Sequence, residues 1–275
     1  MGKKDEHIKD LENILSNYLQ EGRDTELLQY LIENSNLPGR RANLELAEAF
    51  SVLIVKQLDE NLPKILEFIQ KLLEFSNNIA PTNDKKEFLA FCGTWALGAL
   101  GVKENYSTFT YSNLKLMAKD ERWRIREAVA KAITILAQND KKSLIKELKV
   151  WLKEDRSWLI MRAIAAGMAE SLVIPSIMKD ESFATECLEF HKQIFQSIQN
   201  SDEKNSEAFK ALKKGLGFTL SVVVQAIPEK GFELIKNLIK EKNSDILWII
   251  NNNLKKNRLI KNFPKQVKDI KNLLK

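Results

Sequence analysis

The chain has 275 residues, of which 44% are hydrophobic, with only 10 Gly, 6 Pro and a net charge of +6. This composition excludes disorder on a large scale and disfavours an all-β fold, which needs many Gly-rich turns. Leu, Ile, Lys, Glu and Asn dominate instead, so the sequence predicts an all-α protein.

The hydrophobic pattern predicts amphipathic helices from end to end. The series begins with a helix over 5–20 and closes with a short helix over 264–274. Between them we expect about six helix pairs: three span 24–57, 62–100 and 181–226, and three have their first helix at 111–120, 142–155 and 230–245. The breaks fall at turn-forming sequences, which lie at 35–39, 76–84, 101–108, 173–182 and 199–207. None is long enough to link separate domains, so we expect one domain over residues 1–275, loosened near 173–207.

An internal repeat runs through the middle of the chain. The segment DERWRIREAVA (120–130) aligns with DRSWLIMRAIA (155–165) at an offset of 35 residues, and a weaker copy, DILWIINNNL, begins at Asp245. The leading Asp can cap each helix by accepting hydrogen bonds from N–H groups two or three residues ahead. Paired helices that recur every 35 to 45 residues or so are typical of a HEAT or armadillo-like solenoid, here of about six antiparallel pairs.

The apolar segment 88–102 contains GTWALGALG at 93–101. Its glycines are not followed by Lys-Ser or Lys-Thr, so they predict close helix packing rather than a phosphate-binding loop. At 15 residues the segment is shorter than the roughly 20 needed to span a bilayer. The amphipathic start of the chain, residues 1–15, carries acids and differs from a signal peptide. We therefore expect a cytoplasmic protein that does not contact membranes.

Several kinds of catalytic and metal site are missing from the sequence. Cys92 and Cys187 have no second Cys or His at ligand spacing, and His7 and His191 are isolated as well. Neither a metal site nor a disulfide framework is predicted, and the thiols are expected to be reduced. There is no HExxH motif and no recognisable Ser or Cys nucleophile, which disfavours a metalloprotease, kinase or hydrolase of the usual types.

The repeated Trp and the residue one helical turn later share a helix face. Three such pairs occur: Trp123 with Glu127, Trp158 with Arg162, and Trp248 with Asn252. In the helix over 121–138 the expected core stripe is Ile125, Val129, Ala132, Ile133 and Leu136, and the polar stripe is Arg124, Glu127, Lys131, Thr134 and Gln138. One interpretation is structural, with Trp packed between units and Glu127 paired to Arg162. The other is a functional site at the edge of the core stripe.

The segments WRIREAVAKAI and WLIMRAIA resemble bacterial DNA alkylation-repair glycosylases of the AlkC and AlkD type, and the resemblance covers mainly residues 107–172. It implies a HEAT-like fold whose concave surface holds double-stranded DNA. It also implies the excision of cationic N-alkylated purines, such as 3-methyladenine or 7-methylguanine, without a metal or organic cofactor. The family's cleft combines aromatic residues, a carboxylate from one repeat and an arginine from the next.

The resemblance carries these roles to four residues of this chain, which are Trp123, Glu127, Trp158 and Arg162. Glu127 would stabilise the cationic sugar that forms as the glycosidic bond breaks, or orient water. Trp123 and Trp158 would offer π faces to the cationic nucleotide. Arg162 would bind a phosphate with both arms of its guanidinium.

Basic residues add a possible DNA-binding track. From residue 204 onward there are 16 Lys and Arg against 6 Asp and Glu, and residues 1–203 have 27 against 31. The candidate DNA contacts are Arg122, Arg124, Arg126, Lys131, Arg156, Lys255, Lys256, Arg258 and Lys261. Lysines are also common on solvated helix faces and near helix C-termini, so charge alone is compatible with either interpretation.

The leading hypothesis is a monomeric DNA-binding HEAT-repeat protein with alkylpurine glycosylase activity. The alternative is a non-catalytic scaffold that binds DNA without excision, or binds a protein or peptide on its concave face.

Overall fold

The computed structural model describes residues 2–274, which form α-helices, one short 3-10 helix, η1 (Glu104–Tyr106), and no strand. The prediction of an all-α protein is confirmed. The chain divides between Leu136 and Ala137 into two compact units, called here the N-terminal unit and the C-terminal unit. The division falls inside helix α6 (Trp123–Asn139) and not in the stretch 173–207.

The N-terminal unit is built around α3. Its other helices are α1 (Lys3–Glu21), α2 (Thr25–Glu33), α4 (Glu87–Leu100), α5 (Ser107–Met117) and the greater part of α6. Helix α3 (Leu44–Leu73) packs against α1 and α4. It is kinked at Asn61, where φ is −126°, just before Pro63, because proline has no N–H for the helical ladder. The break expected between 57 and 62 is therefore a kink inside one helix.

Helix α4 is buried along its whole length, which explains why its sequence is apolar on every side. Its glycines allow close packing. A β-carbon at Gly98 would lie 2.7 Å from the backbone of Ala132 on α6, and one at Gly93 would lie 2.8 Å from Leu72 Cβ on α3. The prediction that these glycines serve helix packing is confirmed.

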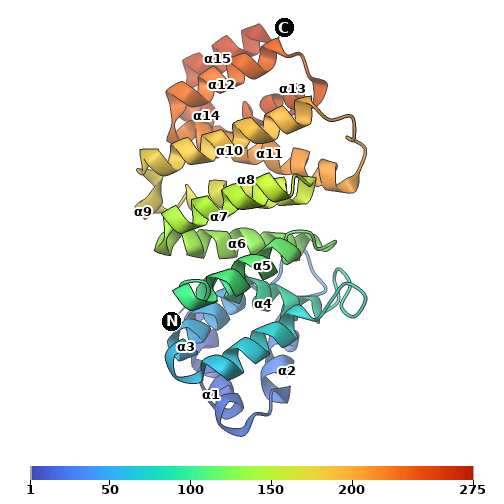
Figure 1. Cartoon of the computed structure of the whole chain (residues 1–275), viewed down its shortest axis with the longest axis vertical. Coiled ribbons are helices and arrows are strands. Elements are labelled where there is room, and N and C mark those ends of the chain that lie inside the picture. Colours follow the sequence, from blue (N-terminus) through green and yellow to red (C-terminus); the bar gives the residue numbers. More distant parts are fainter. Residues whose placement is uncertain (1, 275) are drawn as a thin grey trace. The chain divides into compact units, whose positions relative to one another are not determined.

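The C-terminal unit is organised around α11 (Glu207–Ala226), which packs against five other helices of the unit (Figure 1). These are α8 (Trp158–Ser171), α10 (Glu181–Gln199), α12 (Pro228–Lys240), α13 (Ser244–Asn253) and α14 (Asn257–Asn262). The unit also contains α7 (Lys141–Glu154), α9 (Pro175–Met178) and α15 (Pro264–Leu273). Helix α10 packs against both α8 and α11, and α12 packs against both α11 and α13.

The aspartates of the repeat fix the turns before two helices. Asp120 accepts a hydrogen bond from the Arg122 amide at 2.8 Å, and Asp155 accepts one from the Ser157 amide at 2.9 Å. The third copy differs, because the cap of α13 is Asn243, which accepts from two amides. Asp245 instead forms an ion pair with a lysine of α11.

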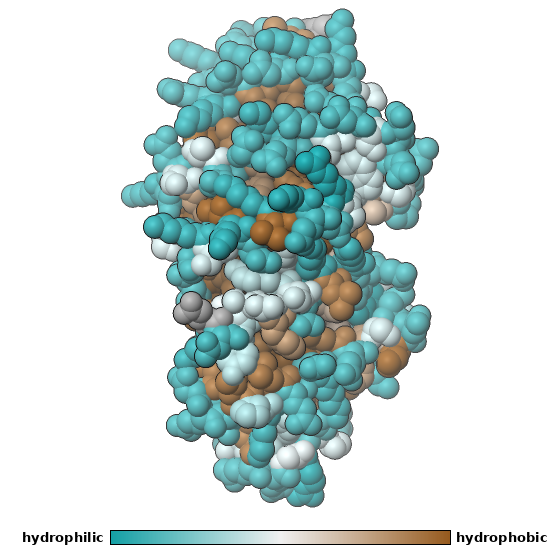
Figure 2. All heavy atoms as spheres, viewed as in Figure 1, coloured by the Kyte–Doolittle hydropathy of each residue, from teal (hydrophilic) through white to brown (hydrophobic). Residues whose placement is uncertain are grey.

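Hydrophilic residues cover most of the face shown in Figure 2, with hydrophobic residues in smaller areas between them. Within residues 2–274, no helix is both long enough and apolar enough to cross a bilayer.

Candidate functional site

Arg122 is a structural residue in the N-terminal unit. Its side chain is only 1% exposed and donates to the Asp120 carboxylate at 2.7 Å and to the carbonyls of Phe75 and Ala80 at 2.7 and 2.9 Å. These bonds fasten the loop between α3 and α4 to the start of α6. The prediction that Arg122 contacts DNA does not fit this environment, because its charged group is enclosed by protein acceptors.

Arg124 is buried as well, although the sequence placed it on a polar stripe. Its guanidinium lies 3.0 Å from Glu87, which is fully buried, and also donates to Asn83 and to the Gly39 carbonyl. The same group stacks at 4.4 Å on the ring of Trp123. A DNA-binding role does not fit Arg124 either. A helical period of 3.6 cannot distinguish a solvated arginine from one whose charge is satisfied by a neighbouring loop.

The remaining candidates of α6 lie nearer to solvent. Trp123 is 43% exposed and Glu127 is exposed one helical turn later. Arg126 is half-buried and donates to the carbonyls of Asp120 and Glu121 at 2.6 and 2.8 Å. Lys131 is half-buried too. Burial lowers its pKa below the ordinary value, and the nearby carboxylate of Glu127 offsets only part of this effect.

In the C-terminal unit Trp158 has a packing role. Its ring meets Phe209 edge-on, with centroids 5.2 Å apart, and its indole N–H donates to the Glu203 carbonyl at 3.1 Å. Arg162 follows one turn later and is 9% exposed, with its stem beside Gly215 on α11. Arg156 lies exposed just before α8. Because Trp123 and Glu127 belong to the other unit, the predicted set of four is divided between the two units.

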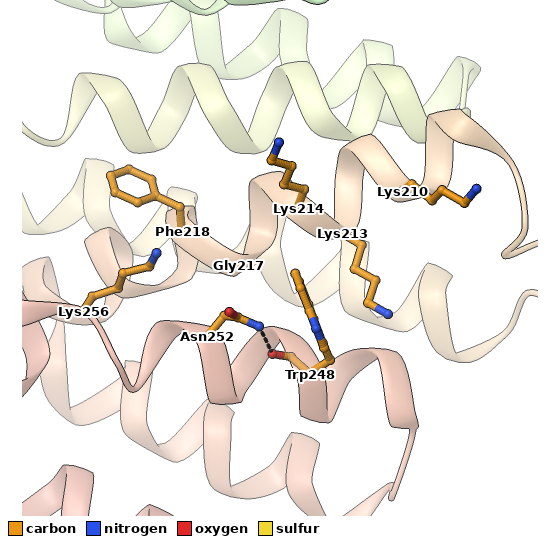
Figure 3. Close-up of a pocket in the computed structure, with 8 residues that line it drawn as sticks. All are labelled: Lys210, Lys213, Lys214, Gly217, Phe218, Trp248, Asn252 and Lys256. Carbon is orange, nitrogen blue, oxygen red and sulfur yellow. Dashed lines mark hydrogen bonds between the residues drawn. The ribbon is translucent and has the colours of Figure 1, made fainter.

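An open groove lies between α11 and α13 in the C-terminal unit and has a volume of about 680 Å³ (Figure 3). We call it the α11–α13 groove. Its lining residues are Lys210, Lys213, Lys214, Gly217, Phe218, Trp248, Asn252 and Lys256. Four of these eight residues are lysines and none is a carboxylate. The groove therefore presents concentrated positive charge beside aromatic surface.

The two aromatic rings of the groove are exposed and flanked by cations. Trp248 is 42% exposed and Phe218 is 48% exposed. Lys213 Nζ lies 4.9 Å from the centroid of the Trp248 ring, and the Arg258 guanidinium lies 4.9 Å from that of Phe218. Lys256 Nζ is also near Phe218, at 5.5 Å, and points toward it in Figure 3. Cation–π attraction holds these side chains over the rings without neutralising their charge.

Two local features shape the groove. Gly217 lets the indole of Trp248 lie against α11, since a β-carbon at 217 would be 3.2 Å from Trp248 Cζ3. Asn252 is anchored by a hydrogen bond from its amide to the Trp248 carbonyl at 2.8 Å, drawn as a dashed line in Figure 3. The indole thus stands on α13 and leans toward the glycine of α11.

The charge of the groove is only partly balanced. Two of the four lysines form ion pairs, Lys213 with Asp245 and Lys210 with Glu207, each at 2.7 Å. Burial lowers the pKa of Arg258, but an arginine keeps its charge at neutral pH. Lys255 and Lys261 lie exposed on the adjoining segment. The structure thus brings two predicted DNA contacts, Lys256 and Arg258, to a basic and aromatic surface.

Sequence reasoning missed the α11 side of the groove. Its members come from KALKKGLGF, residues 210–218, which carried no motif. Two signals were present: the excess of basic residues after residue 204, and two glycines inside a helix, where glycine costs roughly 0.5–1 kcal/mol relative to alanine.

No metal or nucleophile site accompanies the groove. Within residues 2–274 there is no group of three or more His, Cys, Asp or Glu placed to hold a metal ion. Cys92 and Cys187 are free but buried, and burial raises the pKa of their thiols, which makes them poor nucleophiles. Burial lowers the pKa of His191 to about 4. Its ring bridges the Cys187 carbonyl and the Thr219 hydroxyl inside the helical core.

Comparisons with protein-family models, with curated proteins and with solved structures found no match to this chain.

Proposed function

We propose that this chain is a DNA-binding protein built as a HEAT-like solenoid of about six antiparallel helix pairs. The observation that carries the proposal is the α11–α13 groove, where four lysines and two exposed aromatic rings meet and no lining residue is acidic. A polyanion is the natural occupant of such a surface, because each lysine that replaces a condensed counterion on DNA favours binding.

The packing of the C-terminal unit supports the solenoid. Three helix pairs follow one another, α7 with α8, α10 with α11, and α12 with α13. Helix α10 of the second pair contacts α8 of the first pair, and α12 of the third pair contacts α11 of the second pair. Stacking of each pair on its neighbour is how repeat proteins bury faces that one pair cannot bury alone.

Salt dependence tests DNA binding through the groove. A fluorescent 20-base-pair duplex would be titrated with protein at several salt concentrations, and we expect affinity to fall steeply as salt rises. Replacing Lys214 and Lys256 with alanine would reduce the slope of log K against log salt by about 2, since each phosphate contact contributes roughly 0.9.

The matched control replaces Lys236 and Lys240, two exposed lysines of α12 that do not line the groove. This variant has the same net charge as the groove variant, and we expect its slope to stay near that of the wild type. Absence of binding, or binding insensitive to salt, would contradict the proposal and favour the scaffold that binds a protein or peptide. Equal losses in both variants would contradict the groove as the binding surface.

We also propose, from the resemblance of residues 107–172, that the protein excises cationic N-alkylated purines. The supporting observation is that Trp123 and Glu127 are both solvent-accessible and lie one turn apart on α6. An exposed carboxylate can stabilise positive charge on a sugar, and an exposed indole can cover a cationic base.

Release of free 3-methyladenine or 7-methylguanine from methylated duplex DNA tests the excision. We expect Glu127→Gln to lower the rate by about a hundredfold, because the lost charge stabilises the transition state more than the substrate. Glu45→Gln, at an exposed glutamate of the same unit, is the control and should leave the rate unchanged. If the wild type releases no base, the proposed excision is wrong, whatever the result for DNA binding.

A further inference from the structure

We propose that the α11–α13 groove binds an unpaired segment of DNA, whose bases stack on Trp248 and Phe218 while its phosphates contact the surrounding lysines. This inference rests on the proposed DNA-binding function and assigns a kind of ligand to the groove. Trp248 is 42% exposed and Phe218 is 48% exposed, so the groove offers two aromatic side chains that the fold covers only in part.

The arrangement of charge around the rings fits a strand better than a small anion. Lys210, Lys213 and Lys214 project from α11 in different directions, and Lys256 lies beside Phe218 at the far end of the groove from Lys210 (Figure 3). The cations are therefore spread along the groove and do not converge on one point. A chain of phosphates can meet successive lysines, whereas a single phosphate would meet one or two of them.

Exposed rings inside a basic groove favour unpaired bases over a duplex. In a duplex the base faces are covered by their neighbours, so an aromatic side chain can reach them only if the base leaves the stack. In a single strand every base has an accessible π face, and stacking on aromatic side chains strengthens binding without a demand for sequence. Asn252 is the single uncharged polar side chain in the lining, and its amide already donates to the Trp248 carbonyl. Few groups are thus left to read base edges, which fits a binder of low sequence preference.

The volume of the groove agrees with this occupant. About 680 Å³ lies within the usual 300–1,000 Å³ of small-ligand sites, which leaves room for one or two nucleotides beside the rings. The remaining nucleotides of a longer strand would run over the exposed lysines of the adjoining segment, Lys255 and Lys261.

Two ligands of equal charge separate stacking from electrostatics. One is a fluorescent twelve-residue oligothymidine, and the other is a twelve-residue strand of abasic deoxyribose phosphates. We expect the wild-type protein to bind the oligothymidine at least about fivefold more tightly, because each stacked base contributes a factor of this size or more. A twelve-base-pair duplex is the third ligand and should bind more weakly than the oligothymidine.

Two variants at one exposed position test the ring itself. Phe218→Leu keeps an apolar side chain but removes the π face, and we expect it to bind oligothymidine about fivefold more weakly, with abasic affinity unchanged. Phe218→Tyr keeps the ring and should bind both ligands as the wild type does. Circular dichroism and thermal unfolding of each variant would verify that the fold is retained.

The outcomes separate this inference from the proposed function. If neither single strands nor duplex bind, DNA binding fails, and the inference fails with it. If duplex binds as well as oligothymidine and Phe218→Leu changes nothing, the inference is wrong while DNA binding stands. If abasic strand or polyglutamate binds as tightly as oligothymidine, the groove recognises polyanions in general and base stacking is excluded.

Discussion

The indole of Trp248 on α13 lies so close to Gly217 on α11 that a β-carbon at position 217 would sit 3.2 Å from Trp248 Cζ3. Most β-carbons in proteins have no contact this short. The lack of a side chain at Gly217 therefore determines how deeply the indole enters the groove. Glycine inside a helix is unfavourable by roughly 0.5–1 kcal/mol relative to alanine. Helix α11 is thus less stable with Gly217 than it would be with alanine, but the glycine leaves space for the indole of Trp248.

Replacing Gly217 by alanine should therefore separate stability from binding. The added methyl group must push the indole outward by a few tenths of an ångström, and we expect oligothymidine affinity to fall by about threefold to tenfold, or roughly 0.6–1.4 kcal/mol. Gly215→Ala is the matched control in the same helix, because its β-carbon would meet Arg162 Cγ at an ordinary 3.7 Å. That variant should bind as the wild type does and unfold at a higher urea concentration. Equal binding by both variants would contradict this role of Gly217.

Removing the carboxylate next to the groove should strengthen DNA binding. Asp245 forms an ion pair with Lys213, and both side chains are partly exposed, so the pair adds little stability. With Asp245→Asn, Lys213 becomes available to a phosphate, and we expect about twofold to fivefold tighter binding at low salt, vanishing at high salt. Glu241→Gln removes one charge from an exposed residue outside the lining and should have a smaller effect. Weaker binding by Asp245→Asn would show that the ion pair itself supports the groove.

The buried ion pair of the N-terminal unit should be essential to its stability. Arg124→Met would leave Glu87 charged and fully buried without its partner, at a cost of about 3–5 kcal/mol in the free energy of unfolding. The double variant Glu87→Met with Arg124→Met has neither buried charge and so avoids the desolvation cost of both. We expect its free energy of unfolding to fall much less than that of Arg124→Met. Urea denaturation of both single variants and the double variant measures the coupling. Additive losses would contradict a direct interaction.

His191 should make stability depend on pH. Its pKa in the folded protein is lowered to about 4 by burial, from an ordinary value of 6.5, so the unfolded chain binds a proton more readily. The stability is fully present above pH 6.5 and falls as the pH decreases toward 4. Between pH 7.5 and 5 the expected loss is about 2 kcal/mol, since one pKa unit corresponds to about 1.4 kcal/mol. Urea denaturation at both pH values would measure it. In His191→Gln this loss should shrink, and an unchanged pH dependence would exclude His191 as its source.

Much of the fold could be predicted from hydrophobic periodicity and turn residues. The core stripe Ile125, Val129, Ala132, Ile133 and Leu136 is buried in the structure. The kink at Asn61 could not be distinguished from a loop, because a proline near a helical pattern signals either one. The burial of Arg122 and Arg124 could not be predicted, since most of their acceptors, such as the Ala80 carbonyl and the Glu87 carboxylate, lie 37 or more residues away in sequence.

The candidate site was only partly predictable for a related reason. Lys256 and Arg258 were among the predicted DNA contacts, and Trp248 was recognised as a repeat position. Their partners on α11 are 30 or more residues away and look like ordinary solvated lysines in sequence. A basic groove arises when two helices place such residues side by side, and helix packing determines this. The same repeat position therefore yields an exposed ring at Trp248 and a packed ring at Trp158.

The buried side chains of Arg122 and Arg124 also affect how the N-terminal unit unfolds locally. Arg124 binds the Gly39 carbonyl, 85 residues away in sequence, and Arg122 binds the Phe75 carbonyl, 47 residues away. In an ideal repeat stack each repeat contacts only its neighbours, so terminal repeats can fray one at a time. Here the start of α6 is tied to the loops on both sides of α3, so these segments must separate together. The amides of α3 and of the first turns of α6 should therefore exchange their hydrogens with a common free energy, as one cooperative unit.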